Sequence, residues 1–470
     1  MTEKKIGIHI FTRDLRIVDN QALLYLNKEI KTKIMPIFIF NKKQIENKNE
    51  YKSNNSVQFM CECLEDLDRE IKKKKKNGKL LMYYGETIKI LKKIIEEIKK
   101  EKYEIKIITI AKDYTPYAKE REDKIKELCE KNKIEFNAIH DHMITETGKE
   151  TEKITNANGK AYMKFTPYMR EAIKREIKKP DMKKIEEFVD DNKIKKIGIE
   201  DQIRIEEMNR FYKYNPNIWV KGGRERGLEM LKKIPKTYDK TRDNPSKQTT
   251  NLSAYLKFNV ISVREAYEAI KKTKNKKLIS QIYWRDFYMS IMDNYEVINK
   301  DMNNKKIKWK NNEKEFELWK EGKTGYPLVD AGMRQLMTTG YMHNRVRMVV
   351  GSFLVKIMHQ DWRKGEKYFA KNLVDYDPSN NNGGWQWVAG TGTDSQPYFR
   401  YLNPITQSIK FDKECIYIKK YVPELEEVKI EDIHQWETKY KSYPKIEYPK
   451  PLYINEGITK RAKEGIKMYK

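Results

Sequence analysis

Six of the eight tryptophans lie between residues 284 and 387, and their type and placement could serve chemistry. They are Trp284, Trp309, Trp319, Trp362, Trp385 and Trp387. A single tryptophan most often fills a core, because a large aromatic side chain gains from packing. These six, however, lie among many polar side chains. Two interpretations therefore stay open, namely core packing and aromatic groups that take part in a reaction.

A short cluster with hydroxyl groups stands where a helix is expected to begin. Its residues are Thr249, Thr250, Leu252 and Ser253. Hydroxyls and free backbone N–H groups at a helix N-terminus form an anion site that suits a diphosphate. An ordinary helix cap is the alternative, and the cluster alone does not decide between the two.

The first 140 residues alternate between apolar runs and amphipathic stretches. The pattern predicts strands and helices, the strands at Ile6–Phe11, Lys33–Phe40, Leu80–Tyr84 and Ile105–Ile110 and the helices at Val57–Lys75 and Glu86–Lys102. Alternating strands and helices predict an α/β domain with a doubly wound parallel sheet. No G-x-G-x-x-G follows the first strand, so an ordinary dinucleotide site there is not supported.

The rest of the chain divides into a polar, Lys-rich stretch and a helical part. From Leu252 onward strand patterns disappear, and the periodicity predicts helices at Tyr255–Lys271, Leu278–Asn294, Asp330–Thr338, Arg345–His359 and Gly365–Leu373. We therefore expect an α/β domain at 1–140, a partly helical connector at 141–237 and a larger all-helical domain at 238–470.

The net charge of +28 arises from 97 basic and 69 acidic residues. Such a charge attracts polyanions, and nucleic acid is the commonest one. Abundant Lys, Asn and Ile also fit AT-rich coding bias, so charge supports a DNA partner without proving it. Four scattered cysteines predict neither a disulfide framework nor a zinc site. With no signal peptide and no membrane-spanning stretch, we expect a soluble intracellular protein.

Nine segments of the chain match one known family together. They are Ile10–Leu23, Asp113–Arg121, Gln281–Tyr288, Gly322–Met348, Ser352–Lys356, Asp361–Phe369, Asp375–Asp394, Asn403–Asp412 and Tyr421–Leu425. These segments resemble the photolyase/cryptochrome family, and class I-like photolyases for cyclobutane pyrimidine dimers most of all. The resemblance implies an α/β antenna-type domain, a helical FAD-binding catalytic domain and a light-driven reaction on DNA.

The resemblance also implies which residues bind FAD. Tyr238 and the hydroxyl cluster match positions that hold the phosphates. Donors and acceptors for the polar ring edge and the ribityl chain are implied at Arg285, Asn344, Arg347, Asp375 and Asp377. Asn381 matches the position that faces flavin N5. Plant cryptochromes carry Asp there, so an uncharged amide favours reduced anionic flavin and a repair enzyme.

Two further roles follow from the resemblance for the tryptophans. Trp385, Trp362 and Trp309 match an electron-transfer chain that photoreduces resting FAD, a role that suits oxidisable indoles. Trp284 and Trp387 match the pair that wedges against a flipped-out dimer, since a stacked lesion cannot reach a buried flavin. Contacts to flanking DNA phosphates are implied for Arg242, Arg345 and Arg400.

The choice of lesion depends on three positions. Enzymes for (6-4) photoproducts carry two histidines four residues apart, and this chain has Asn344 and Met348 there, with His343 displaced by one. Asn344 and Met348 match dimer-splitting enzymes. Gln281 departs from that pattern, because those enzymes usually place Glu there to hydrogen-bond the thymine edge, whereas Gln is found in the (6-4) branch. Gln keeps an acceptor but exchanges an acidic proton for an amide donor.

We therefore predict light-driven repair of cyclobutane pyrimidine dimers, in which excited FADH⁻ passes an electron to the lesion and recovers it. A cryptochrome-like photoreceptor without repair and a (6-4) photolyase are the alternatives. The expected partner is UV-damaged DNA, bound by a monomer without metal or membrane. A second chromophore that serves as an antenna, whether deazaflavin, folate or flavin, is left open.

Overall fold

The apolar runs near the N-terminus form a six-stranded sheet in the computed structural model, with strand order β5-β4-β1-β2-β3-β6. The strands are β1 (Lys4–Phe11), β2 (Lys33–Asn41), β3 (Leu81–Gly85), β4 (Tyr103–Ala111), β5 (Glu135–Ile139) and β6 (Gln202–Ile203). The first five run parallel, and β6 pairs antiparallel with β3. The predicted doubly wound sheet is confirmed, and each of the four predicted strands overlaps an observed one.

The structure describes residues 4–30, 33–149, 151–183, 185, 187–190, 201–303, 307–394, 399–454 and 456–469. The chain divides into two compact units. The sheet unit comprises 1–214, 220–234 and 250–295, and the helical unit comprises 215–219, 235–249 and 296–470. The predicted domain bounds at 140 and 237 stay a prediction.

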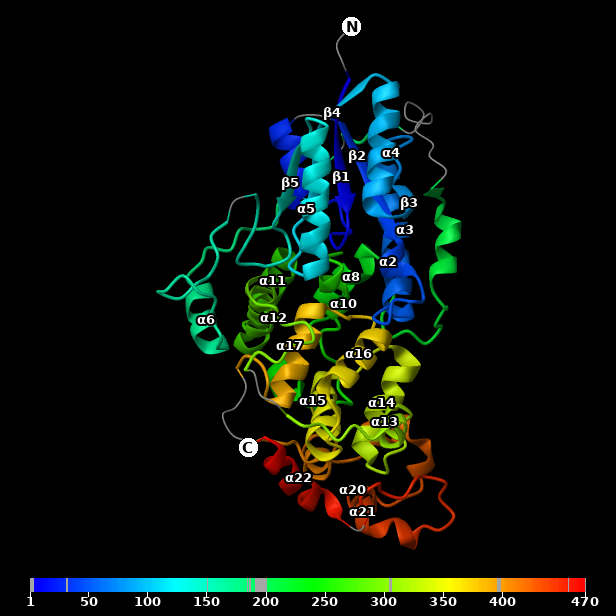
Figure 1. Ribbon diagram of the computed structural model, residues 1–470. Helices are drawn as coiled ribbons and strands as arrows, with labels where there is room; N and C mark the ends of the chain where they lie inside the picture. The colour runs from blue at the N-terminus through cyan, green and yellow to red at the C-terminus, as the bar shows by residue number, and fades with distance from the viewer. Residues whose placement is uncertain are drawn as a thin grey trace. The chain divides into compact units, whose positions relative to one another are not determined.

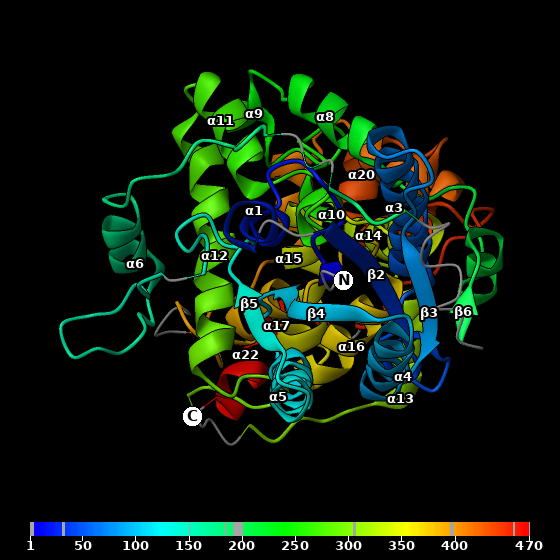
Figure 2. The ribbon, with the colours of Figure 1, turned by 90° about the horizontal axis from the view of Figure 1, so that it is seen from above.

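Helices cover both faces of the sheet. As seen from above, α4 (Thr87–Lys100) and α5 (Pro116–Lys131) lie on one face, and α1 (Gln21–Tyr25) and α3 (Asn54–Lys74) on the other (Figure 2). The apolar side of α4 is buried because isoleucines and a leucine recur at helical spacing. The remaining helices in the described part of this unit are η1 (Leu26–Ile30), α2 (Lys42–Ile45), α6 (Phe165–Ala172), η2 (Ile205–Phe211), α8 (Arg224–Lys232), α10 (Ser253–Lys257), α11 (Val263–Lys272) and α12 (Lys276–Asn294).

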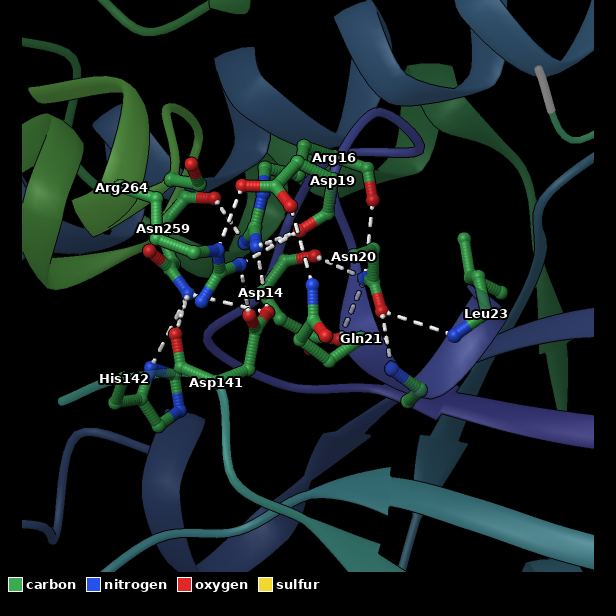
Figure 3. Close-up of polar contacts among 12 residues, drawn as sticks. Asp14, Arg16, Asp19, Asn20, Gln21, Leu23, Asp141, His142, Asn259 and Arg264 are labelled. Carbon is green, nitrogen blue, oxygen red and sulfur yellow. Dashed lines mark hydrogen bonds and ion pairs between the residues drawn. The ribbon is translucent and has the colours of Figure 1, made fainter. Parts of the chain in front are cut away.

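A buried polar cluster fixes the loop after β1 (Figure 3). Arg264 donates to Asp19 Oδ2 at 2.9 Å and to Asp141 Oδ1 at 2.7 Å, and Arg16 donates to Asp141 Oδ2 at 2.6 Å. The Asn20 amide oxygen accepts two backbone N–H groups at the start of α1. Buried charges persist only when they are paired and hydrogen-bonded. The polar residues of this opening segment therefore maintain the fold.

Within its described residues, the regular secondary structure of the helical unit is entirely helical (Figure 1). They are α9 (Tyr238–Thr241), α13 (Glu313–Lys320), α14 (Pro327–Thr339), α15 (Asn344–Ser352), η3 (Phe353–Ile357), α16 (Trp362–Asn372), α17 (Pro378–Ala389), α18 (Pro404–Phe411), α19 (Ile416–Tyr421), η4 (Pro423–Leu425), α20 (Ile430–His434), α21 (Trp436–Lys439), η5 (Tyr440–Ser442) and α22 (Gly457–Met468). Their core includes Trp319 and Phe353. Among the described residues, no helix of either unit has the length and apolar character needed to span a membrane.

Two helix predictions need correction. The helix predicted at Tyr255–Lys271 is divided into α10 and α11, because Asn259 has a positive φ of 49° and Ser262 starts a new helix with a capping box. The helix predicted at Arg345–His359 continues from α15 into the π-helical turn η3 and ends at Ile357. The predicted connector contains α6, β6, η2 and α8, and its residues 191–200 lie outside the described part.

Candidate functional site

Helix α17 carries several of the predicted site residues, and its sequence explains where it begins and ends. The Asp377 carboxylate accepts the backbone N–H of Asn380 at 3.0 Å, and Pro378 takes the first helical position. Gly390, with a φ of 75°, ends the helix. The asparagines and glycines between these caps are weak helix formers. The caps therefore establish a helix that presents Asn381, Trp385 and Trp387.

Asn381 is oriented by a buried acid on the neighbouring helix α16. Its Nδ2 donates to Glu366 Oε1 at 2.9 Å and to the Glu366 carbonyl oxygen at 3.1 Å. The carbonyl oxygen can only accept, so the amide nitrogen must point toward Glu366. This leaves the Asn381 Oδ1 outside the pair, as an acceptor. Burial raises the pKa of Glu366, which is 3% exposed, to about 7.

Helix α17 borders both open and packed space near Asn381. A Cβ built on Gly384 would meet no atom within 4 Å, whereas a Cβ at Gly365 of α16 would lie 2.2 Å from the Trp385 ring. Asn381 stands three residues before Gly384 and four before Trp385, so it lies beside both positions on the helix surface. Open space next to an amide acceptor fits a flat flavin ring.

An ion pair predicted beside the flavin is present in the helical unit. Arg347 donates to Asp375 Oδ2 at 2.9 Å and Oδ1 at 3.1 Å, and its Nε donates to the Met342 carbonyl at 2.8 Å. The guanidinium lies 5.3 Å from the centre of the Tyr341 ring, which stacks on Trp219 at 5.1 Å. The Tyr341 ring and a fork of hydrogen bonds thus fix the Arg347 head group.

The residues predicted for the FAD phosphates lie in both units. Tyr238 begins the short helix α9 of the helical unit, where Thr249 hydrogen-bonds the Tyr341 side chain. Thr250, Leu252 and Ser253 belong to the sheet unit, and α10 begins at Ser253. Each group offers hydroxyls, and their joint role toward a diphosphate stays a prediction.

The three tryptophans predicted for electron transfer differ in burial. Trp385 is 4% exposed, Trp362 is fully buried, and Trp309 is half-buried. The Trp362 indole donates to Asp301 Oδ1 at 2.8 Å, and the Arg363 guanidinium lies 5.0 Å from its ring centre. Of the three, Trp309 is the most exposed, which suits the outer end of a path from a buried flavin to the surface.

Helix α12 positions three predicted residues in the sheet unit. Arg285 is buried and donates to the carbonyl oxygens of His142 and of Leu256, the latter at 3.1 Å. Trp284 is half-buried and stacks on Phe165, with ring centres 3.7 Å apart. Gln281 folds back, since its Nε2 donates to the Lys277 carbonyl at 3.2 Å.

Helix α15 presents Asn344 and Met348 on one face. Asn344 is exposed, and its Nδ2 lies 3.8 Å from the Met348 sulfur. His343 does not join them, because it is 4% exposed and its Nδ1 accepts the Arg345 N–H as the N-cap of the helix. Burial, with Arg347 nearby, lowers the His343 pKa to about 4. The imidazole is therefore neutral at physiological pH and serves the helix end.

The predicted DNA-binding arginines have different surroundings. Arg400 is exposed, lies 5.9 Å from the Trp387 ring centre and lines a pocket with it. Arg345 is half-buried and pairs with Asp243 Oδ1 at 2.7 Å. Arg242 forms the C-cap of α9. Only Arg400 combines an exposed guanidinium with a contact to a predicted wedge, and the DNA roles of all three stay predictions.

Sequence reasoning missed Glu366, Tyr341 and Phe165, each of which contacts a predicted site residue. Phe165 stands in the stretch predicted as a connector, and Glu366 has no partner within its own helix. Their contacts join elements far apart in sequence, so no local pattern indicated them. Helix α17 itself could have been predicted from Asp377-Pro378 and Gly390.

Comparisons with known proteins agree with this geometry. The family described as the FAD binding domain of DNA photolyase matches residues 278–468, and the family described as DNA photolyase matches residues 7–186. The deoxyribodipyrimidine photo-lyase of Buchnera aphidicola from Acyrthosiphon pisum is 32% identical, over 96% of this chain and 94% of the relative. That of Alkalihalophilus pseudofirmus is 35% identical, over 73% of this chain and 74% of the relative.

Solved structures show the same fold. The photolyase of Sulfolobus tokodaii, determined with two FAD molecules, has a TM-score of 0.84 and 36% identity, over 99% of each chain. A cryptochrome of Synechocystis has a TM-score of 0.86 at 24% identity and speaks for the fold alone. The α/β sheet and the helical FAD-binding domain define a light-dependent flavoprotein fold. The chain belongs to the DNA photolyase family.

Proposed function

We propose that this protein splits cyclobutane pyrimidine dimers in UV-damaged DNA, using light and reduced FAD. The observation that supports this choice best is helix α15, where Asn344 is exposed with the half-buried Met348 beside it, while His343 is buried as a helix cap. A (6-4) reaction needs paired histidines for acid–base work at the lesion hydroxyl. Here the one nearby imidazole is neutral and committed to the backbone.

Bound FAD, once reduced and excited by light, would supply the electron that opens the dimer and would take it back. The chain's residues hold and tune this cofactor. Asn381 Oδ1 offers an acceptor to flavin N5–H, because its Nδ2 is held by Glu366. Arg347 and Asp375 present a fixed fork of charge to the polar ring edge. Trp385, Trp362 and Trp309 deliver electrons from the surface to keep the cofactor reduced.

The DNA would be held by one surface cation and two indoles. Trp284 and Trp387, each half-buried, offer faces against which a flipped dimer can pack. Arg400, exposed beside Trp387, would bind a flanking phosphate. Log affinity falls as log salt concentration rises, and each phosphate contact makes this slope steeper by about 0.9. We therefore expect Arg400→Gln to weaken binding to damaged and undamaged DNA alike and to lower the salt slope by about one.

A (6-4) photolyase is the second candidate, and Gln281 is the observation that favours it. An antenna chromophore is also proposed for the sheet unit, and the Sulfolobus relative is described with a light-harvesting cofactor.

The decisive experiment for the choice of lesion is lesion-resolved repair. Photoreduced protein is illuminated with duplexes that each carry one photoproduct, and restored bases are quantified. We expect bases to be restored only from cyclobutane dimers. Cyclobutane dimers that stay intact after illumination would refute the proposal.

A further inference from the structure

The indole of Trp284 stacks face to face on the ring of Phe165. The two ring centres lie 3.7 Å apart, and the planes differ by 9°. Phe165 is the first residue of α6, a helix that lies beside α12 (Figure 2). It is 8% exposed, while Trp284 keeps part of its surface in solvent. One face of the indole is thus covered by a ring from the stretch predicted as a connector.

The rest of the Trp284 ring is bordered by its own helix. The edge of Phe287 meets it with ring centres 5.7 Å apart and planes at 84°, and Tyr288 lies 5.6 Å away. Phe287, fully buried, also meets Phe165 edge-on at 5.9 Å. Edge-to-face and offset contacts of this kind stabilise aromatic pairs beyond their buried area. The three rings together restrict the rotamer of Trp284.

The segment that carries Phe165 is itself tied to α12. Lys153 forms an ion pair with Asp293, and the Tyr295 hydroxyl donates to the Ala161 carbonyl at 3.1 Å. Further along, the buried Tyr168 contacts Phe287 at 5.4 Å. These contacts lie before and after Phe165 in sequence. The position of its ring is therefore set by the segment as a whole.

We propose that Phe165 is a positioning residue for lesion recognition, a role that rests on the proposed function. It covers one face of Trp284 and holds the indole in the orientation that the flipped dimer needs. A tryptophan that is already ordered loses less entropy on binding, so affinity rises without any new contact to DNA. Because undamaged duplex keeps its bases stacked, it makes no use of this face, and the effect is specific to the lesion.

A second role for the same contact predicts the opposite change in lesion affinity when Phe165 is substituted. A ring stacked at 3.7 Å occupies the place that a nucleobase would take, so Phe165 could act as a plug that the lesion must displace. Removal of a plug strengthens lesion binding, whereas removal of a positioning residue weakens it. The two roles are therefore distinguished by one measurement. We favour positioning, because Phe165 is buried and its segment is fixed at several points.

The experiment uses the full chain with FAD bound and reduced. Dissociation constants are measured in the dark for a duplex with one cyclobutane dimer and for the same duplex undamaged. Phe165→Leu keeps apolar volume without a ring, and Phe165→Tyr restores the ring. We expect Phe165→Leu to weaken binding of the damaged duplex roughly 2- to 10-fold. Binding of undamaged duplex should stay unchanged, and Phe165→Tyr should recover lesion affinity.

Phe211→Leu is the matched control. Phe211 is 6% exposed and stacks on Phe40 at 4.6 Å, in the same unit but without an aromatic contact to Trp284. A double-mutant cycle adds a second test, because Phe165→Leu should have no further effect once Trp284→Ala is present. FAD content and melting temperature are recorded for every variant. If Phe165→Leu fails to fold, Phe165→Met takes its place in each comparison.

Three outcomes would overturn the inference. Tighter lesion binding by Phe165→Leu would establish a plug, and an equal loss for damaged and undamaged duplex would indicate a general structural effect. If the effects of Phe165→Leu and Trp284→Ala on lesion binding were additive, Phe165 would not act through the Trp284 indole. Failure of the proposed function is seen earlier, in the unmodified protein, if it neither prefers the damaged duplex nor repairs it under light.

Discussion

The amide nitrogen of Asn381 donates to Oε1 of Glu366 at 2.9 Å, and this single contact determines which atom Asn381 can offer to a cofactor. A second bond, to the Glu366 carbonyl oxygen at 3.1 Å, fixes the same orientation. The Oδ1 atom is left as the acceptor. An acceptor that adds no charge is compatible with an anionic reduced flavin. The pair thus connects a buried acid to the redox preference of the site.

We expect Asn381→Asp to make the bound flavin easier to oxidise. A carboxylate at this position adds a negative charge beside both Glu366 and the reduced flavin, and like charges at short distance repel. Reoxidation in air, followed by absorbance after photoreduction, should accelerate at least several-fold. Asn372→Asp, at the end of α16, controls for adding a carboxylate to a half-buried helical position. Equal reoxidation rates in the two variants would contradict this role.

Glu366 should make the stability of the protein fall as pH rises. Burial raises its pKa to about 7 from an ordinary value of 4.5. Between these two values the folded protein binds more protons than the unfolded chain, so the free energy of unfolding decreases with increasing pH. The loss begins near pH 4.5, levels off above about 7 and amounts to about 3 kcal/mol.

Glu366→Gln tests this dependence, because the amide does not titrate and still offers an acceptor to Asn381. Its free energy of unfolding, measured by denaturant titration from pH 5 to 8, should lack the decrease that the parent shows. Subtracting the two curves removes the contributions of all other titrating groups. A difference curve without slope between pH 5 and 7 would refute the raised pKa.

Sequence patterns predicted the sheet well, because buried parallel strands are continuous apolar runs. The strand β5 was missed, since its residues Glu135 and Asn137 interrupt the apolar pattern. The helix α17 was missed for a different reason. Its Asn-rich and Gly-rich start opposes helix propensity, and only the caps at Asp377 and Gly390 reveal it.

Some contacts of the candidate site could be predicted from the sequence, and others could not. The Arg347–Asp375 pair is present as the resemblance implied, because both residues stand in long matching segments. Glu366 and Phe165 could not be predicted from local patterns, since each acts through a residue on another helix. Trp219 is a similar case, because it stacks on Tyr341 from a five-residue segment between two parts of the other unit. Such contacts arise from tertiary packing and leave no periodic signal.

The electron-transfer chain can be tested apart from repair. Trp309→Phe and Trp362→Phe should abolish or slow, by at least tenfold, the photoreduction of oxidised FAD, because phenylalanine is much harder to oxidise. Dimer repair by chemically reduced protein should remain near the parent rate. Trp436→Phe is the control, since Trp436 is a core indole that is 2% exposed and has no predicted role in the chain. Normal photoreduction in both chain variants would exclude this path.

The Arg347–Asp375 pair should contribute to folding and to FAD retention. Asp375→Asn leaves the Arg347 charge without its counter-ion, and the Asp375 side chain is 4% exposed while that of Arg347 is 25% exposed. We expect a loss of about 2–3 kcal/mol in the free energy of unfolding, below the range for fully buried pairs because water reaches Arg347. FAD should dissociate more readily on dilution.

The matched comparison is Glu296→Gln, which breaks the exposed pair with Lys300, whose side chains are 82% and 64% exposed. Exposed pairs contribute little, so this change should leave the free energy of unfolding nearly unchanged. Both variants are unfolded by denaturant, and FAD release is followed by fluorescence. Equal, small effects of the two substitutions would show that the Asp375 carboxylate does not stabilise the site.

We expect Gln281 to affect how well a dimer is recognised, and Gln281→Glu tests this role. The Gln281 amide nitrogen donates to the Lys277 carbonyl at 3.2 Å and to the Ser280 hydroxyl at 3.3 Å. A carboxylate cannot donate to that carbonyl, so the substitution releases the side chain from its own helix. We expect cyclobutane-dimer repair per absorbed photon to rise by at most about 2- to 12-fold, because one hydrogen bond is worth roughly 0.5–1.5 kcal/mol. Gln281→Leu, which neither donates nor accepts, should lower the repair yield.

Lesion-resolved repair assays compare the three proteins on duplexes with one cyclobutane dimer or one (6-4) photoproduct. Since the lesion preference is attributed to Asn344 and Met348, neither substitution should create (6-4) repair, and such repair in the parent protein would instead assign Gln281 to that chemistry.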